Sequence, residues 1–446
     1  MDHDPRPPHH PRRHGAHRLR WVVLGALILL ALAGCAIMWR PALEPQPAPQ
    51  GRAAAQAFDA ATVEHGRQLA ALGSCAACHT VDPSRPYAGG LALATPFGTV
   101  YSTNITPDAR TGIGAWSEQA FARALREGVS RDGHLLYPAF PYDYYTHMKQ
   151  EDVHALYAYL MTRPALDAPA HGNSLNFPFG FRPLVAFWNV LYLKKDDAWA
   201  PDVHQSAEWN RGAYLADAVA HCGACHTPRT KLGGTDTKRY LDGGEAEGWY
   251  VPALNQHSPS PLPWTAEQLA SYLRTGIALD HAAAGGPMQS VVENLRFADQ
   301  RDVTALATWV HSYMEKAPHD APRARTAGNL PAPDAIEADA RMREGHAVYE
   351  NACARCHALG RSESSGAALP LQKAVALYDP DPRSLIHIVH DGIQPPNGEP
   401  ARWMPAFGAI LTDQQTAALA AYLRRYGAGK DPWDHIEDSV RKAKQP

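Results

Sequence analysis

The feature that most constrains the fold of this 446-residue chain is the pattern CxxCH, which occurs three times. The copies are CAACH (Cys75, Cys78, His79), CGACH (Cys222, Cys225, His226) and CARCH (Cys353, Cys356, His357). Two thiols in this spacing can bond to the vinyl groups of one haem, and the adjacent imidazole can bind its iron. A disulfide needs no neighbouring histidine, and a zinc ribbon needs two CxxC pairs about 15 to 20 residues apart. The sequence therefore predicts three covalently bound haem c groups.

A threefold repeat surrounds these motifs. Each motif follows a helical stretch that contains a glycine, and each unit closes with a helix rich in alanine and leucine that carries an aromatic residue. The pairs are Gly66 with Tyr159, Gly212 with Trp309, and Gly345 with Tyr422. A glycine opposite a broad ring lets two helices cross at close range. We therefore expect an all-α protein with three tandem class I cytochrome c domains.

A middle helix recurs in each unit and ends at a glycine. Thr265 with Gln268 predicts a capping box at the start of one middle helix, and Thr412 with Gln415 predicts one at the start of a closing helix. Counting twelve residues beyond Gly276 and Gly392 gives Met288 and Met404, whereas the same count beyond Gly128 gives Phe140. A methionine opposite the histidine gives haem iron a sixth ligand and raises its reduction potential. A lone methionine is more often a core residue. The shared offset favours ligation, so Met288 and Met404 are predicted axial ligands.

Phe140 stands where the other two units have a thioether, and it cannot bind iron. We expect its ring to pack over the face of the first haem. Three alternatives remain for the sixth ligand of that haem. The first is an open or weakly ligated iron, the second is Met148, and the third is His147. His134 is a weaker candidate.

The N-terminal residues predict export. Residues 1–20 are basic, and the uncharged run 21–39 would reach roughly 28 Å as a helix, which is close to the thickness of the hydrocarbon layer. The positive-inside rule then keeps residues 1–20 in the cytoplasm and places the rest across the membrane. The alternative is a lipoprotein signal, because LAGC, which ends at Cys35, resembles a lipoprotein cleavage box. The formal net charge of −3 gives no reason to expect nucleic acid as a partner.

These patterns predict the organisation of the chain. After the anchor we expect a Pro- and Ala-rich tether (40–60), a first cytochrome c domain (61–165), an interdomain segment (166–204), a second domain (205–318), a linker (319–335), a third domain (336–430) and a polar tail (431–446). The apolar stretch 174–193 is interrupted by Pro178, Arg182 and Pro183, so it is not a second span. Packing between domains is its first interpretation, and docking to a partner or a membrane surface is the second.

From about Glu64 to Tyr426 the chain resembles the membrane-bound triheme cytochrome c subunits of bacterial periplasmic dehydrogenases. The most specific motifs are TPFGTVYSTNITPDARTGIGAWSEQAFARALREGV, LYPAFPYDYYTH, EDVHALYAYLMTRP, GWYVPALN and MPAFG. The alcohol dehydrogenase branch usually has Met in place of Phe140, so this chain is more similar to the branch that serves molybdenum hydroxylases acting on nicotinate or isoquinoline. That departure weakens a methionine ligand for the first haem, and it leaves Met288 and Met404 unaffected. In the family, the loop that contains Asn104 holds haem edge groups, although an ordinary turn role fits the residue equally well.

The resemblance implies electron transfer rather than chemistry on a substrate. Electrons would pass from a catalytic dehydrogenase subunit, with an iron-sulfur subunit as a further partner, to membrane quinone or a terminal oxidase. The chain would lie in the bacterial inner membrane with its haem domains in the periplasm. No catalytic residue is assigned, because no paired carboxylates, nucleophile elbow or phosphate loop stand out. The alternative is an independent haem enzyme, such as a peroxidase or a small-molecule reductase, that uses an open first haem.

Overall fold

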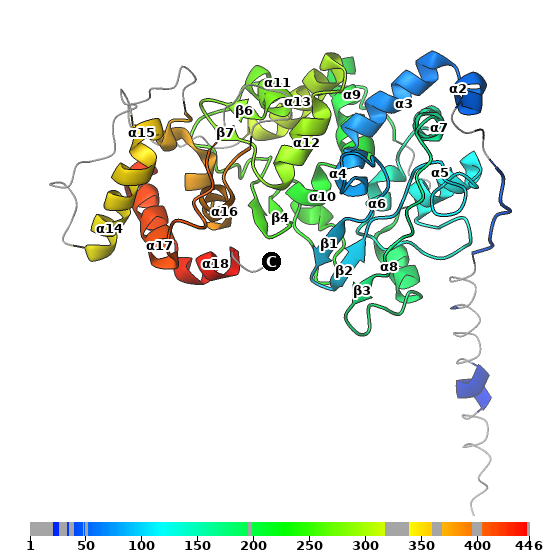
Figure 1. The fold of residues 1–446 in the computed structure, drawn as a ribbon, viewed down its shortest axis with the longest axis horizontal. Coiled ribbons are helices and arrows are strands. Elements are labelled where there is room, and N and C mark those ends of the chain that lie inside the picture. The colour runs from blue at the N-terminus through cyan, green and yellow to red at the C-terminus, as the bar shows by residue number, and fades with distance from the viewer. Residues whose placement is uncertain are drawn as a thin grey trace, which may run out of the picture.

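The computed structural model describes residues 21–25, 34, 40–47, 49, 52–194, 199–316, 339–358, 368–394 and 404–443. Within these ranges the protein is mostly helical, as the sequence predicts, and short antiparallel strands join some of the helices (Figure 1). In the same ranges no helix is both long enough and apolar enough to cross a bilayer. Most of the predicted span 21–39, including Cys35, and the whole linker 319–335 lie outside the described residues.

The first unit and the segment that follows it contain the three-stranded sheet. The elements are α2 (Arg52–Ala57), α3 (Ala60–Leu72), α4 (Cys75–His79), β1 (Ala92–Thr95), β2 (Gly98–Tyr101), α5 (Glu118–Glu127), α6 (Tyr142–Tyr145), α7 (Gln150–Met161), β3 (Ser174–Leu175) and α8 (Leu184–Tyr192). Strands β1, β2 and β3 form one antiparallel sheet in that order. The sequence did not indicate these strands, because each is at most four residues long and has no clear alternation of buried and exposed residues.

The second and third units repeat the helical pattern. The second contains α9 (Ala207–Tyr214), the π-helical turn η1 (Leu215–Val219), α10 (Gly223–His226), β4 (Gly244–Ala246), β5 (Trp249–Val251), α11 (Ala266–Thr275), β6 (Ile277–Ala278), β7 (Ala282–Ala283), α12 (Pro287–Leu295) and α13 (Gln300–Met314). The third contains α14 (Ala340–Val348), the π-helical turn η4 (Tyr349–Cys353), α15 (Ala354–His357), α16 (Arg383–Asp391), α17 (Asp413–Tyr422) and α18 (Ile436–Ala443).

The first and last helices of each unit cross at the predicted glycine. A Cβ atom at Gly66 would lie 1.9 Å from the carbonyl oxygen of Ala155 and 2.7 Å from Cβ of Tyr159. The other two crossings have the same geometry, with 2.0 Å from Gly212 to the oxygen of Ala305 and 2.2 Å from Gly345 to the oxygen of Ala418. Only a residue without a side chain fits at these positions. The prediction of three close helix crossings is confirmed.

Several middle and closing helices begin and end where the sequence indicates. Thr265 with Gln268 and Thr412 with Gln415 both form complete capping boxes, at the starts of α11 and α17. Helices α5 and α11 stop at Gly128 and Gly276, which both adopt left-handed backbone angles. These local signals were strong enough to predict the helix ends from sequence.

The first two units share one hydrophobic core, which includes Leu69, Leu156, Leu215 and Trp309. They pack reciprocally, since α6 of the first unit contacts η1 of the second, and α12 of the second unit contacts α3 and α4 of the first. The third unit has a separate core around α14, α16, α17 and α18 (Figure 1). The molecule therefore consists of a fused pair of units and a third unit beside the second.

Candidate haem sites

Each CxxCH motif lies in a short helix, which follows a sharp turn in the first two units and a π-helical turn in the third. Ser74 and His221, the residues directly before the first and second motifs, adopt positive φ angles of 49° and 43°. The six motif cysteines are free thiols, and burial raises the pKa of Cys75, Cys222 and Cys353 to about 12 in each case. These thiols are therefore neutral at physiological pH and stand in apolar surroundings. A pair of thiols one helical turn apart in such surroundings suits a large apolar cofactor.

The histidine of each motif is held in the same way in all three units. Nδ1 of His79 lies 2.6 Å from the carbonyl oxygen of Thr103, Nδ1 of His226 lies 2.8 Å from that of Pro252, and Nδ1 of His357 lies 3.1 Å from that of Leu369. A carbonyl oxygen can only accept a hydrogen bond, so Nδ1 carries the proton and Nε2 keeps its lone pair.

Burial also lowers the pKa of all three histidines, so each imidazole stays neutral and able to bind a metal ion. This orientation of a metal-binding imidazole by a second hydrogen bond is the usual arrangement in proteins. The three motifs thus fit haem c in their thiols, their imidazole tautomer and their environment.

The attachment motifs of the first two units lie side by side. The charge of Cys225 is among the causes that raise the pKa of Cys78, and the carboxylate of Glu247 affects both thiols. Glu247 stands at the turn between β4 and β5, and burial raises its own pKa. The β4–β5 hairpin starts at the second motif, where the backbone N–H of Gly243 donates to the carbonyl oxygen of His226 at 2.9 Å. This hairpin therefore contacts the second motif and carries a carboxylate near the first.

The two predicted methionine ligands do not occupy equivalent backbone positions. In the first two units the chain folds back quickly after the middle helix, where Val129 pairs with Leu135 and Ile277 pairs with Ala283. In the third unit the matching residue, Ile393, pairs directly with Met404, through two hydrogen bonds of 2.9 Å.

By this register Met404 corresponds to Leu135 and Ala283 rather than to Phe140 and Met288. The third loop is longer by five residues, and residues 395–403 of it lie outside the described part. The equivalence inferred from the count of twelve is therefore wrong, because it compares loops of different length. Met288, in the first turn of α12, and Met404 are both half-buried, and they stay predicted ligands that must be tested separately.

The distal side of the first unit is built from aromatic residues. The ring of Phe140 contacts that of Tyr145, with 5.4 Å between the centroids. Tyr145 is buried, and Cys75 and Cys78 are among the causes that raise its pKa. Phe140 thus contacts a ring that lies near the first motif, and its place over the haem face stays a prediction. Sequence reasoning missed Tyr145, although it lies in the same LYPAFPYDYYTH motif.

The alternative ligands of the first unit have different surroundings. Met148 is 4% exposed and belongs to the shared core with Tyr145. His134 is close to solvent, and its Nδ1 lies 2.5 Å from the carboxylate of Asp132. His147 is half-buried and lies near Asp143 and Asp217. Met148 is more deeply buried than His147 or His134, and the choice between an open iron, Met148 and His147 stays a prediction.

Asn104 has a structural role in its loop. Its Nδ2 donates to Thr111 Oγ1 at 3.0 Å and to the carbonyl oxygen of Leu166 at 2.7 Å, while its Oδ1 accepts from the N–H of Thr106 at 2.9 Å. The side chain is 3% exposed. Asn104 therefore fixes the turn that presents the Thr103 carbonyl to His79.

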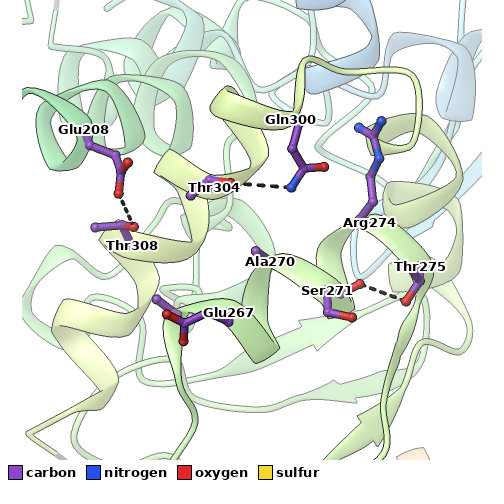
Figure 2. A pocket seen from close by; sticks show the side chains of 10 residues that line it. Glu208, Glu267, Ala270, Ser271, Arg274, Thr275, Gln300, Thr304 and Thr308 are labelled. Carbon is purple, nitrogen blue, oxygen red and sulfur yellow. Dashed lines mark hydrogen bonds between the residues drawn. The ribbon is translucent and has the colours of Figure 1, made fainter.

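A depression of about 460 Å³ opens at the surface between α9, α11 and α13 (Figure 2). Polar side chains line it, and Glu208 accepts a hydrogen bond of 2.7 Å from Thr308 across it. Its lining contains none of the cysteines, histidines or methionines predicted to hold haem. This depression is consequently separate from the haem sites.

Comparison with known proteins finds cytochrome c patterns in two parts of the chain. Residues 63–164 match the family described as cytochrome c, and residues 340–423 match the one described as cytochrome C oxidase, cbb3-type, subunit III. The chain is 34% identical to the fructose dehydrogenase cytochrome subunit of Gluconobacter japonicus, over 89% of this chain and 83% of that protein. It is 39% identical to the gluconate 2-dehydrogenase cytochrome c subunit of Pantoea cypripedii, over 83% of this chain and 86% of the relative.

A further relative has a different architecture. The chain is 41% identical to a nicotinate dehydrogenase subunit of Pseudomonas putida over 93% of its own length. The present chain covers only 34% of the length of that relative. The matching region thus forms one part of a larger polypeptide there.

Proposed function

This chain belongs to the family of dehydrogenase cytochrome c subunits, and we propose that it holds three haem c groups and carries electrons for a membrane-bound periplasmic dehydrogenase. The electrons would come from a catalytic subunit and go to membrane quinone or a terminal acceptor. The observation that supports three haems is the repeated Nδ1 hydrogen bond of His79, His226 and His357, which occurs in the second unit as well as in the two units that family patterns match.

Haem c, when bound, supplies a one-electron iron couple. The residues of the chain do the rest. The cysteine thiols would hold the cofactor covalently and the three imidazoles would present Nε2 to its iron, while the carbonyl oxygens of Thr103, Pro252 and Leu369 hold those imidazoles in one tautomer. The aromatic residues around Phe140 keep water from the distal side of the first unit. Met288 and Met404 are the proposed distal ligands of the second and third units.

We further propose a partner and a location. The 41% identity to the nicotinate dehydrogenase subunit favours a molybdenum hydroxylase as the catalytic partner, with an iron-sulfur subunit, over a quinoprotein. Residues 21–39 would anchor the chain in the inner membrane with the haem units in the periplasm. The independent haem enzyme is the weaker alternative, since the relatives are named as dehydrogenase subunits and the described distal residues of the first unit are largely aromatic.

The haem count is tested directly by mass. Acid denaturation followed by extraction with organic solvent should leave the colour on the polypeptide, and the mass should correspond to the chain with three haems. A double Cys222→Ser, Cys225→Ser variant should carry two. If the wild-type chain carries two haems, or loses its colour to the solvent, the triheme proposal is wrong.

The partner is tested by isolating the protein from its native membrane. We expect a dehydrogenase subunit to co-purify, and its cofactor decides between a molybdenum hydroxylase and a quinoprotein. Turnover of an organic substrate by the isolated chain alone would overturn the electron-transfer proposal.

A further inference from the structure

A group of large apolar side chains is exposed around α8 and the loop before it. Phe177 is 96% exposed, Phe181 62% and Phe187 53%. Four further members are Phe179, Val190, Leu191 and Leu232. We call these seven residues the α8 patch. Single exposed apolar residues are ordinary, but a contiguous group of this kind marks a surface that binds something apolar.

The α8 patch is a firmly held surface. Helix α8 buries Val185, Ala186 and Asn189 on its inner face, where Asn189 accepts a hydrogen bond of 2.6 Å from the hydroxyl of Tyr142. Its outer face exposes Phe187, Val190 and Leu191. The side chains are therefore presented outward by a helix whose other face is anchored in the first unit.

The rest of the α8 patch is joined to this helix by specific contacts. Trp188 Nε1 donates to the carbonyl oxygen of Leu232 at 3.1 Å, which places the second-unit loop beside α8. The ring of Phe179 contacts that of Phe97, with 4.6 Å between the centroids. The patch thus spans both units of the fused pair.

The chain enters the first unit next to this patch. The N–H of Leu43 donates to the carbonyl oxygen of Arg131 at 2.7 Å, and the guanidinium of Arg131 donates back to the carbonyl of Leu43 at 3.2 Å. Arg40 packs against Gly133 in the same loop, where a Cβ would lie 2.3 Å from the Arg40 carbonyl oxygen. Arg40 is the first residue after the predicted membrane span.

The same loop also supports α8. Arg182, just before the helix, donates to the carbonyl oxygen of Leu135 at 2.6 Å, and Leu135 packs with Val185 and Ala186. Residues 40–47 and the buried face of α8 thus both contact the loop 131–135, while the α8 patch lies on the other face of the same helix. In Figure 1, α8 and the loop around β3 project from the lower edge of the molecule, toward which residues 40–47 also run.

We infer that the α8 patch inserts into the interfacial region of the bilayer in which residues 21–39 are anchored. The occupant is lipid: aromatic and aliphatic side chains would enter the boundary between headgroups and acyl chains, and the exposed Lys194 and Lys231 beside them would face phosphate groups. This inference rests on the proposed membrane anchor, since the anchor holds the patch at the surface. It also orients the fused pair of units, with α8 toward the membrane.

The test uses the full holoprotein in vesicles of phosphatidylethanolamine and phosphatidylglycerol that contain a phosphatidylcholine with a photoreactive acyl chain. After irradiation, peptide mass spectrometry locates the lipid adducts. Adducts in 21–39 and also in 177–191 are expected. Adducts in 21–39 alone would overturn the inference and leave the anchor in place, whereas no adduct in either segment would overturn the anchor as well.

Substitutions test whether lipid labelling depends on the α8 patch itself or on the exposure of apolar side chains in general. Phe177→Ser with Phe187→Ser should remove the adducts in 177–191 and leave those in 21–39 unchanged. Ile410→Ser is the matched control, because Ile410 is 69% exposed on the third unit and lies outside the patch. If a co-purified catalytic subunit, rather than lipid, shields 177–191 from labelling, the patch is a protein interface and the inference is wrong.

Discussion

A single methyl group decides whether the paired helices of each unit can meet. Gly212 lies in α9, where an alanine would by intrinsic propensity favour the helix by about 1 kcal/mol. The structure opposes this gain, because the new Cβ would lie 2.0 Å from the carbonyl oxygen of Ala305. Backbone cannot move aside as a flexible side chain can, so overpacking dominates.

We therefore predict that Gly212→Ala lowers the free energy of unfolding by about 1 to 3 kcal/mol or more. Thermal unfolding followed by circular dichroism measures this change. Gly172→Ala is the control, because a Cβ there meets no atom within 4 Å, and its effect should stay within about 0.5 kcal/mol. A stabilised Gly212→Ala protein would show that the helices do not cross as described.

Asp379 is a buried carboxyl in the third unit, and its Oδ1 has no hydrogen-bond partner within the described structure. Burial raises its pKa to about 8, although Arg424 and Lys430 oppose this shift and Asp381 adds to it. The folded protein thus holds a proton that the unfolded chain releases near its ordinary pKa of about 4. Its contribution to stability is complete below pH 4 and is lost as the pH rises toward 8.

Asp379→Asn should remove this loss, because the amide cannot ionise. Relative to wild type, the variant should gain stability between pH 5 and pH 8, by a few kcal/mol at about 1.4 kcal/mol for each pKa unit. Unfolding curves at a series of pH values test this difference. A constant difference between the two proteins over that range would mean that Asp379 is already ionised in the folded state.

The distal ligands give a spectroscopic prediction at the residue scale. Replacing Met288 or Met404 with Ala should each convert one low-spin ferric centre to high spin, since the sixth ligand of one iron would be lost. With Phe140 in the first unit, wild-type protein should already show a high-spin or pH-labile signal from one third of its iron. Electron paramagnetic resonance measures both effects. Three equivalent low-spin His/Met centres would contradict the assignment of the first unit, and Met148→Ala would then identify its ligand.

At the scale of elements, the β4–β5 hairpin connects the second unit to the third. The indole of Trp249 stacks on His387 of α16, with 4.8 Å between the centroids and 19° between the planes. It also presses on Gly286, where a Cβ would lie 2.2 Å from the ring. Arg383 extends the contact with a 2.5 Å ion pair to Glu245, and Ser384 donates to the carbonyl of Tyr250 at 2.7 Å. One short hairpin thus joins the second unit to the third through a ring stack, an ion pair and a hydrogen bond.

Trp249→Ala should loosen this junction without unfolding either side. Hydrogen exchange in the first turns of α16 should become faster, while α14 and α17, inside the third core, should keep their protection. Phe297→Ala is a matched control in the second unit, because Phe297 is 58% exposed. Unchanged exchange in α16 would show that the ion pair of Arg383 holds the units together without the indole.

The elements also show which features a sequence can predict. Capping boxes, helix-ending glycines and the glycine–aromatic crossings depend on residues close in sequence or on a repeated pattern, and these predictions are confirmed. The place of Met404 depends on how far a loop extends before Ile393 finds its partner, which no residue count reveals. Trp249 and Tyr145 were missed for a similar reason. Their motifs were visible, but their partners in other units were not, namely His387 for Trp249 and His221 for Tyr145.

At the scale of the whole molecule, three repeats in sequence form two separate hydrophobic cores. Core residues of the first and second units form one cluster, and the third unit has its own. A polar network also crosses the first pair, because Asp152 of α7 binds both His65 of α3, at 2.6 Å, and the hydroxyl of Tyr214 of α9. The contacts to the third unit are fewer and more polar, such as the 2.5 Å pair of Lys373 with Asp280.

Calorimetry of the holoprotein should therefore show two unfolding transitions rather than three or one. Gly66→Ala and Gly212→Ala, in different units, should lower the same transition, since damage to either half of a shared core destabilises both. Gly345→Ala should lower only the other transition, because its clash with the carbonyl oxygen of Ala418 lies within the third core. If Gly66→Ala and Gly212→Ala shifted separate transitions, the first two units would unfold independently, and their common core would contribute little to cooperativity.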